Sequence, residues 1–476
     1  MTDETLFELP EPNAPKALPP TRPEDARVLR PVREQVEWSP RTLDSLIPLE
    51  HQARAIWQTL ERLDLSGFYA RVKAVYGHAG HPTTDPKVLL SLWLYATTEG
   101  VGSARLLARL CEEHDAYRWL RGGVPINYHM ISDFRVANQE ALDELLTEII
   151  ASMMASGLVT LRHVAQDGMR TRASAGASSF RSEETLARCL AEAKAQVEHL
   201  AREREAPDPG ASDRVSKREQ AARERAASER TARIEEAIRR LPEVKEVKQR
   251  QGRTLAKAKR GKVTKARVSS TDPDAKVMKM PNGGFNPAYN LEAATDVDSQ
   301  VIVGVGVVTK GSDGGQALPM VAQIKRRLGD AAQALGAVAV AEPPGQTLEP
   351  PEVPKVLEGY LIDGGFATRE DITELERAEI TVYAPTRAPR TTTSGRSQAE
   401  PRPDDTAEVA AWRARMETED AKQVYKERAA TAECVNAHLR RYGLQQLLVR
   451  GPGKVLSVLL LVAIAHDILR WIALGA

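Results

Sequence analysis

The sequence is poor in cysteine and lacks an apolar run of membrane-spanning length. Its three cysteines, Cys111, Cys189 and Cys434, are scattered through 476 residues without the spacing of a zinc site. This scarcity argues against a disulfide framework and predicts a cytosolic protein with no membrane association. The longest mainly apolar stretch, Val455 to Ala465, is too short to span a bilayer. We therefore expect this stretch to form a buried core helix.

Charge of one sign is not in excess either. The 66 basic and 65 acidic residues leave a net charge of +1, so only local clusters of basic residues could bind a phosphate backbone. Residues 1–40 lack the basic and apolar regions of a signal peptide, and their composition rich in Pro, Glu and Arg predicts a disordered arm. The remaining length is enough for two or three domains.

Residues 41–160 have the pattern of an all-α domain. Residues 87–95 (KVLLSLWLY) are strongly apolar and follow Pro86, a residue typical of the first position of a helix, and Ser103 precedes a second helical stretch, ARLLARLCEE. Arginines on or near these helices, among them Arg105, Arg109 and Arg135, would suit a helix-turn-helix that binds DNA. The alternative is a leucine-rich domain that only holds a dimer together.

Strand patterns begin after residue 160 and alternate with helical ones. They cover residues 163–167, 288–297, 301–309, 360–363 and 380–384, and a long helix follows near 421–441. This order favours a mixed sheet flanked by helices. Three segments interrupt the order and are interpreted as insertions: a charged helical segment at 181–270, and two loose or low-complexity segments at 331–357 and 386–410.

Three acidic residues are candidates for chemistry. Asp167 and Asp363 each end a strand pattern and precede glycine, which suits a ligand at the edge of a sheet, although Asp-Gly is also a common turn. Glu433 lies on the long helix among small apolar residues; a helical Glu is usually a solvated surface charge, but one packed against a sheet needs a cation as partner. Three converging carboxylates would favour Mg²⁺, and two such ions can drive displacement at phosphorus.

The order and spacing of several segments resemble bacterial insertion-sequence transposases with an InsH-type helical N-terminal domain and an RNase H-like DDE catalytic core. The resemblance covers most of residues 41–476 and is weakest in the three insertions. The matching segments include HPTTDPKVLLSLWLYATTEGVGSARLLARLCEEHDAYRWLRGG, ISDFR, VAQDGMRTRASAG, GGFNPAYNLEAATDVDSQVIVGVGVVT, KGSDGGQALPM, YLIDGGFATREDI, TVYAPTR and YKERAATAECVNA.

The resemblance implies a site and a reaction. It assigns the catalytic and metal-binding triad to Asp167, Asp363 and Glu433, holding two Mg²⁺ ions with Mn²⁺ as a substitute, and it places Tyr425 and Arg428 upstream of the Glu as DNA contacts. Arg440 stands where the family usually has Lys, which keeps the charge but changes the geometry. Two further departures are Met130, where Thr is common, and Asp467, where Asn is common.

The implied architecture is α+β, or α/β: an all-α DNA-binding domain at 41–160, then an RNase H-like domain at 161–476 with a charged helical insertion. The implied activity is metal-dependent cleavage at the ends of the element and strand transfer into target DNA, by a homodimer bound to terminal inverted repeats, in the cytoplasm with the nucleoid. The alternatives are an RNase H-like nuclease without strand transfer, and a catalytically inactive DNA-binding protein derived from a transposase.

One run of basic residues stands out. The stretch from Lys248 to Arg267 contains no acidic residue. Such a run can neutralise phosphates without reading sequence, and the alternative is a solvated insertion whose charge only maintains solubility. The residues we assign to DNA here are Lys257, Lys259, Arg260 and Lys262.

Overall fold

The first half of the described chain is a cluster of helices. The computed structural model describes residues 40–74, 82–205, 215–254, 266–340, 357–386 and 400–475. The expected arm at 1–40 therefore lies outside the described residues, except Pro40. A short 3₁₀ turn, η1 (Asp44–Leu46), precedes seven helices: α1 (Gln52–Leu60), α2 (Ser66–Tyr69), α3 (Pro86–Thr98), α4 (Ala104–Glu113), α5 (Asp115–Arg121), α6 (Tyr128–Ala137) and α7 (Gln139–Ala155). The prediction of a helical N-terminal region is confirmed.

Side-chain caps explain where several of these helices begin. The Asp85 carboxylate accepts a hydrogen bond from the backbone N–H of Lys87 and is followed by Pro86 at the first helical position. Ser103 caps α4 and Asn127 caps α6 in the same way. Helix α3 is buried along almost its whole length, which explains why its sequence is apolar on every face.

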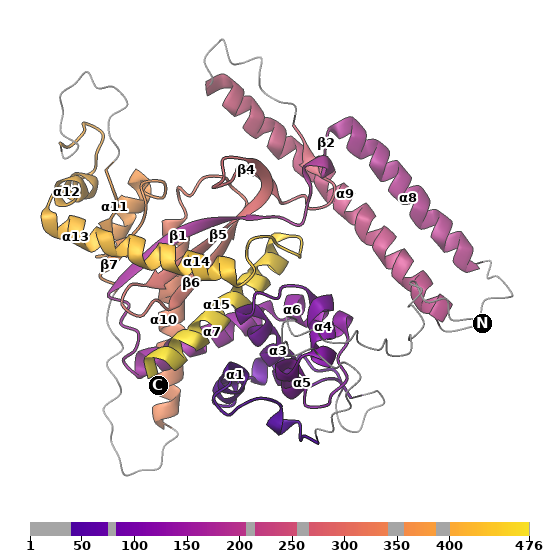
Figure 1. Ribbon diagram of the computed structural model, residues 1–476. Helices are drawn as coiled ribbons and strands as arrows, with labels where there is room; N and C mark the ends of the chain where they lie inside the picture. Colours follow the sequence, from indigo (N-terminus) through magenta and orange to yellow (C-terminus); the bar gives the residue numbers. More distant parts are fainter. Residues whose placement is uncertain are drawn as a thin grey trace, which may run out of the picture. The chain divides into compact units, whose positions relative to one another are not determined.

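The core of this helical cluster is completed by a helix from the other end of the chain. Helix α15 (Pro452–Gly475) packs on α3, α6 and α7 and also on strand β6 (Ile302–Val308) (Figure 1). By length and composition alone α15 could cross a membrane, but 67% of its most apolar window is buried inside the protein. The prediction of a buried core helix at 455–465 is confirmed. Residues 43–476 consequently form one unit rather than two separable ones.

A mixed sheet forms the second half. Its central strand β1 (His163–Arg172) pairs antiparallel with β5 (Phe285–Asp296) and parallel with β7 (Gly359–Leu361). Beyond them, β7 pairs parallel with β8 (Thr381–Tyr383), and β5 pairs antiparallel with β6 and with β4 (Lys276–Lys279) (Figure 1). This order and these directions are consistent with an RNase H-like core, and the α+β fold is as predicted.

Helices accompany the sheet in the expected order. They are α10 (Ala317–Val340), α11 (Arg369–Arg377), α12 (Ala407–Arg415), α13 (Glu419–Arg428) and α14 (Cys434–Arg441), and a π-helical segment η4 (Ala429–Glu433) joins the last two. The η4 segment contacts β1 directly, so the α13–η4–α14 helix lies against the central strand. This helix was predicted near 421–441.

Three boundaries differ from the predictions. Strand β1 does not end at Asp167 but continues to Arg172, because β5 pairs with it as far as Arg172 opposite Ala288. Residues 331–340, predicted as part of a loose loop, continue helix α10, while 341–356 lie outside the described residues. In the third predicted insertion, 387–399 lie outside the described residues, but helix α12 already begins at Ala407.

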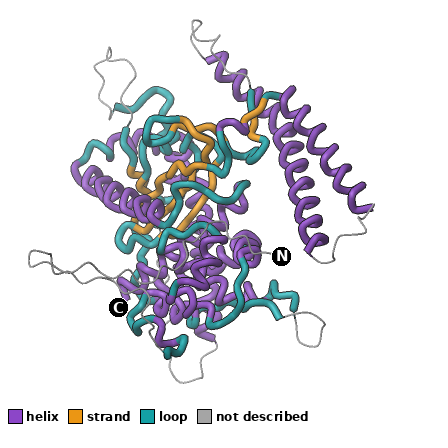
Figure 2. The backbone as a smooth tube through the Cα atoms, turned by 45° about the vertical axis from the view of Figure 1, so that its right-hand side comes forward, coloured by secondary structure: helices purple, strands orange, loops and turns teal. Residues whose placement is uncertain are grey.

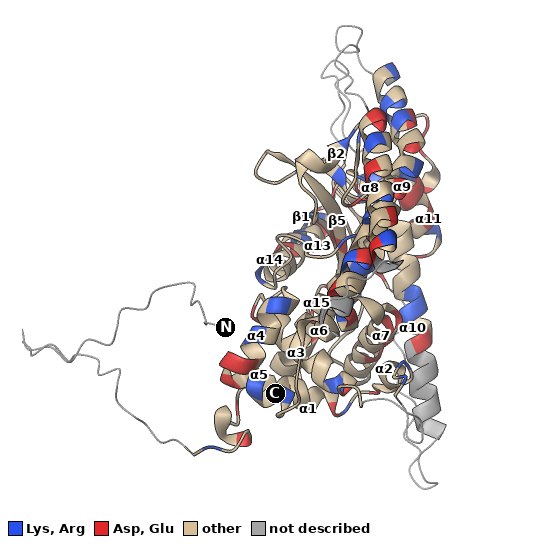
Figure 3. Ribbon diagram, turned by 90° about the vertical axis from the view of Figure 1, so that its right-hand side faces the viewer, with Lys and Arg blue, Asp and Glu red and all other residues tan. Residues whose placement is uncertain are grey.

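The charged insertion is a pair of helices. Helices α8 (Glu183–Glu205) and α9 (Val215–Thr254) pack side by side (Figure 2), and strands β2 (Phe180–Arg181) and β3 (Val268–Ser269) pair antiparallel at its base. Their shared apolar seam is narrow: Leu186, Ala193, Ile234, Ala237, Leu241 and Val268. Basic and acidic residues are interspersed along both helices (Figure 3). The prediction of a helical insertion is confirmed.

One buried carboxyl joins α15 to the sheet. Asp467, fully buried on α15, accepts a hydrogen bond from the backbone N–H of Ile302 through Oδ1 at 2.8 Å, while its Oδ2 has no partner among the described residues. Burial raises the pKa of this carboxyl well above 3.8, although Arg327 and Arg470 act in the opposite direction. The folded state therefore favours the protonated form.

Replacing this acid by its neutral analogue should stabilise the protein at neutral pH. A carboxyl whose pKa is raised on folding contributes its full stability below the unfolded pKa of about 4 and loses it as pH rises toward the folded pKa. We expect Asp467→Asn to raise the melting temperature by a few degrees at pH 8 and by less at pH 5. Thermal unfolding at both pH values measures this, with the exposed Asp420→Asn as control. An equal effect at both pH values would contradict it.

Candidate active site

Asp167 lies inside the central strand β1. Side chains of the helix that crosses this strand bind its carboxylate. Its Oδ1 accepts a hydrogen bond from Arg428 Nη2 at 3.0 Å, and its Oδ2 accepts one from Asn436 Nδ2 at 2.8 Å. The backbone N–H of Gly168 also donates to Oδ1. Burial raises the pKa of Asp167 and Arg428 opposes that rise. Both carboxylate oxygens are therefore engaged, and one of them is paired with a cationic side chain.

Asp363 follows β7 in the tight turn that leads to α11. Its Oδ1 accepts hydrogen bonds from the backbone N–H groups of Gly365, at 2.5 Å, and Phe366, at 3.2 Å. A Cβ on Gly365 would lie 2.7 Å from Asp363 Oδ1 and 3.4 Å from Asp313 Oδ2. The position thus requires glycine, and the carboxylates of Asp363 and Asp313 approach the same point in space.

The π-helical segment changes which residues share a face of the crossing helix. In a regular α-helix, residues five apart are rotated by about 140°, so Arg428 and Glu433 would point in different directions. The π turn at Ala429–Glu433 lessens that rotation, although Glu433 remains exposed while Asn436 is buried. Tyr425, three residues before Arg428, belongs to the same face and is partly buried, which raises its pKa.

Glu433 nevertheless stays apart from the two aspartates. Its side chain is exposed, whereas Asp167 and Asp363 are partly buried. Among the described residues, no three His, Cys, Asp or Glu side chains are close enough to hold one metal ion. The structure therefore brings Asp167 and Asp363 into one region. Glu433 lies on the adjoining helix, and the three carboxylates do not converge on one metal position.

Two further acidic residues lie beside the aspartates, and sequence reasoning assigned them no role. Glu292 on β5 is buried, and burial together with the nearby carboxylates of Asp313, Asp167 and Asp363 raises its pKa to about 8. Asp313 lies in the loop between β6 and α10 and is half-buried. In the sequence, Asn290 and Glu292 stand two residues apart in a strand that is buried for most of its length, but no local pattern links them to Asp313.

The donor chemistry of this region fits a hard divalent cation. Four carboxylates, those of Asp167, Glu292, Asp313 and Asp363, influence one another electrostatically, and the cationic side chains that act on them are Arg428 and Arg170. The buried Oδ1 of Asn290 has no hydrogen-bond partner among the described residues. Mg²⁺ binds oxygen ligands, and carboxylate oxygens and a free amide oxygen are both of this kind.

A cavity of about 400 Å³ adjoins Asp363. Its wall includes Ser312, Gly314, Gly364, Gly365, Ala367, Thr368, Arg369, Ile372, Pro385, Arg402, Trp412 and Arg413. Two of its arginines, Arg413 and Arg369, form ion pairs with Asp405, so much of their charge is already compensated. The buried indole N–H of Trp412 has no partner among the described residues. The cavity gives a ligand access to the turn that carries Asp363.

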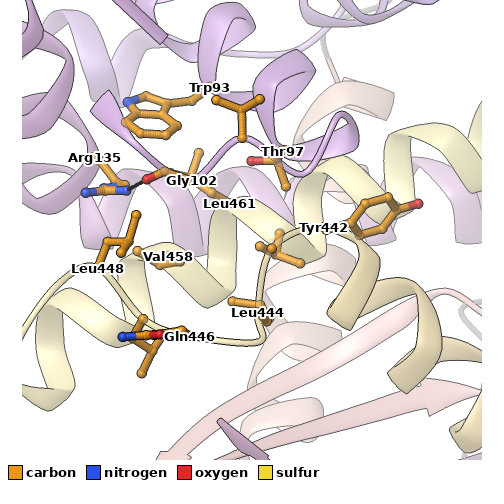
Figure 4. A pocket seen from close by; sticks show the side chains of 14 residues that line it. Trp93, Thr97, Gly102, Arg135, Tyr442, Leu444, Gln446, Leu448, Val458 and Leu461 are labelled. Atoms are coloured by element: carbon orange, nitrogen blue, oxygen red, sulfur yellow. Dashed lines mark hydrogen bonds between the residues drawn. The ribbon is translucent and has the colours of Figure 1, made fainter. Parts of the chain in front are cut away.

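Arg135, predicted as a DNA contact, is buried inside the fold. Arg135 is only 6% exposed; its Nη1 donates to the carbonyl of Gly102 at 2.6 Å, and its guanidinium lies 4.5 Å from the centre of the Trp93 ring (Figure 4). Burial lowers its pKa to about 10, so it keeps its charge at neutral pH. Because it faces an internal cavity of about 30 Å³, it is not available to a DNA phosphate.

The other predicted DNA contacts differ in their accessibility. On α4, Arg105 stacks on Tyr128 at 5.1 Å, and the exposed Arg109 forms an ion pair with Glu113 at 3.5 Å. Arg440 is exposed on α14. Four more lie outside the described residues: Lys257, Lys259, Arg260 and Lys262.

Comparison with known families agrees with the two halves of this architecture. Residues 41–137 match the family described as Transposase domain (DUF772), and residues 386–472 match the family described as Transposase DDE domain. No curated protein and no solved structure matches the chain. The second match contains Glu433 and the crossing helix, while Asp167 and Asp363 lie outside both.

A helical N-terminal region followed by a mixed sheet with helices is consistent with an RNase H-like core, and the two matches are both to transposase domains. The chain is a transposase with a DUF772 N-terminal domain of the InsH type and a DDE transposase domain.

The structure predicts that Arg135 supports the fold rather than DNA binding. Arg135→Ala removes a charged hydrogen bond to the Gly102 carbonyl and the contact with Trp93, and it should lower the free energy of unfolding by roughly 1.5–3 kcal/mol. Arg109→Ala, on an exposed face, should change it by less than about 0.5 kcal/mol. Denaturant unfolding of both variants measures this. Equal stability of the two would show that Arg135 has no such role.

Proposed function

We propose that this protein is a DNA transposase that cleaves DNA at the ends of an insertion sequence and transfers the cut strand into target DNA. The observation that supports this most is the placement of the two aspartates. Strands β1 and β7 run parallel with Ala165 opposite Leu361. Asp167 and Asp363 each follow this last pair by two residues, so the parallel register supports a placement of both carboxylates in the same region, where β7 ends beside β1.

The chain's own residues suggest how the site would work. Asp167, Asp363 and Glu433 would hold the metal, and two divalent ions, Mg²⁺ or Mn²⁺, would activate water or a DNA 3′-hydroxyl and stabilise the leaving oxygen. Arg428 holds Asp167 by an ion pair, so a cation must compete with its guanidinium for Oδ1. Glu433 lies on the exposed side of the same helix, where movement of that helix or of the side chain would bring it in.

DNA would be held by residues around this site. Tyr425, Arg428 and Arg440 follow one another along the crossing helix, and Arg105 and Arg109 lie on α4. We propose that residues 41–160 recognise the terminal inverted repeats and residues 161–476 carry the chemistry, preceded by an arm at 1–40. Because α15 packs into the helical cluster, these two parts would act as one body. The DNA complex would contain two copies of the chain, in the cytoplasm with the nucleoid.

A second candidate function follows from the position of Glu433. Its exposure, together with the lack of any group of three potential metal-binding side chains among the described residues, would also suit a protein that binds transposon ends without cutting them. A nuclease that cleaves without strand transfer is the remaining alternative. An assay that scores binding, cleavage and joining separately distinguishes all three.

Removing any triad carboxylate should abolish cleavage and spare binding. Asp167→Asn, Asp363→Asn and Glu433→Gln each remove a negative charge with little change of shape, and we expect cleavage to fall by about 10³-fold or more, because the carboxylates hold the metal while affinity comes from basic side chains. The substrate is DNA carrying the inverted repeats that flank the gene, in Mg²⁺ and in EDTA. Asp420→Asn, an exposed acid on α13, is the control. Wild-type cleavage by Glu433→Gln would remove that residue from the site.

The basic run should contribute to DNA affinity without contributing to sequence preference. Within this run, Arg253 and Arg267 belong to the described residues. Replacing the seven residues Arg253, Lys257, Lys259, Arg260, Lys262, Lys265 and Arg267 by Gln should weaken binding equally on specific and random DNA. Each lost phosphate contact should reduce the slope of log affinity against log salt by about 0.9. Binding titrations at several salt concentrations test this. An unchanged slope would mean that the segment is a solvated insertion.

A further inference from the structure

We propose that Asp313 is a further carboxylate of the metal site, acting together with Asp363 and held in place by Asn290. This inference rests on the proposed function, because it concerns the same site. Neither family match includes Asp313, which stands in the segment Lys310 to Met320 between β6 and α10. Three independent features of the structure carry it.

The first feature is the approach of Asp313 to Asp363. The space beside Gly365 in which a Cβ would lie is 2.7 Å from Asp363 Oδ1 and 3.4 Å from Asp313 Oδ2. Two carboxylates from different elements thus face one small volume that only a glycine leaves open. Such a pair gains from a cation that faces both.

The second feature is the way Asn290 holds Asp313. Asn290 is 1% exposed, and its Nδ2 donates to Asp313 Oδ1 at 2.7 Å and to Glu292 Oε1 at 2.5 Å. The amide thereby fixes one oxygen of Asp313 and leaves Oδ2 turned toward Gly365. A loop carboxylate without such a partner would be free to turn into solvent. This one is tied to the central part of the sheet.

The third feature is an unsatisfied acceptor in the same place. Asn290 Oδ1 is buried and has no hydrogen-bond partner among the described residues. A buried acceptor left unpaired costs about 1–3 kcal/mol unless a donor or cation meets it. Since its own amide nitrogen is bound to two carboxylates, this oxygen adds to an oxygen-rich group that lacks donors, which is the environment of a hard cation.

Gly168 explains how these groups come so close to the central strand. A Cβ there would lie 2.8 Å from Asn290 Nδ2 and 3.0 Å from both Asn290 Oδ1 and Glu292 Oε1. Strand register places Gly168 opposite Glu292 and Arg170 opposite Asn290, so these side chains share one face of β1 and Asp167 lies on the other. The missing side chain at Gly168 therefore lets the Asn290–Asp313 pair lie close against β1 on its own face.

Direct cation binding by the full-length protein tests the assignment. Mn²⁺ titrations followed by electron paramagnetic resonance, without DNA, should show that Asp313→Asn weakens Mn²⁺ binding by roughly 10- to 100-fold, the range expected even for groups one shell removed from a metal. The change keeps an oxygen acceptor for Asn290 and removes only the charge. Asn290→Ala, which leaves every carboxylate in place, should cause a smaller loss. Asp420→Asn should bind Mn²⁺ as the wild type does.

Two comparisons separate the possible outcomes. If Asp363→Asn weakens Mn²⁺ binding while Asp313→Asn and Asn290→Ala bind as the wild type does, Asp313 has no part in the site, and the proposed function is untouched. If Asp363→Asn also binds normally, the metal site itself is misplaced and both proposals fail. Thermal unfolding of each variant accompanies the titration, and a Mn²⁺-dependent rise in melting temperature that Asp313→Asn diminishes without lowering the metal-free melting temperature supports the assignment.

Discussion

A carboxylate in the interior of the central strand needs a compensating partner, and the arrangement around the sheet follows from that need. Asp167 pairs with Ala293 of β5 and is partly buried. Without a cation its charge would be costly. Arg428 and Asn436 supply the compensation, and both come from the helix that the η4 segment presses against β1. The bonds to the partly buried carboxylate of Asp167 thus help to fix the position of that helix, and with it the position of Glu433.

The sequence allowed the layout of elements to be predicted because periodicity is a local property. The helical region, the β5–β6 hairpin, helix α11 and the buried stretch of α15 all follow from apolar spacing, caps and turn residues. The end of β1 could not be predicted from such local patterns. Residues 168–172 carry no apolar run, and they are a strand because β5 pairs with them. A partner strand more than a hundred residues away cannot be inferred from local pattern.

Some residues of the candidate site could likewise be predicted from local sequence patterns, and others could not. Asp167 and Asp363 could be found from strand patterns that lead into glycine, and the resemblance added Glu433. Asp313 and Asn290 could not, since their importance depends on a distance between a loop and a strand. Arg135 was assigned to DNA because arginine on a helix is usually at the surface. The fold instead places it over Trp93, where a guanidinium can lie against an indole while bonding to a backbone carbonyl.

The position of α15 has a consequence for the order in which the chain acquires its structure. Helices α3, α6 and α7 and strand β6 are all synthesised before residues 452–475, yet they bury apolar surface against that stretch. During synthesis, the apolar surface of these elements therefore stays exposed until residues 452–475 have been made. Chains with such exposed surface bind chaperones or aggregate. A product that stops before Pro452 would keep the arginines of α4 and both Asp167 and Asp363 but lack the helix that packs on both the helical cluster and the sheet. Incomplete translation of this gene would therefore yield proteins prone to degradation, and not shortened competitors for the same DNA.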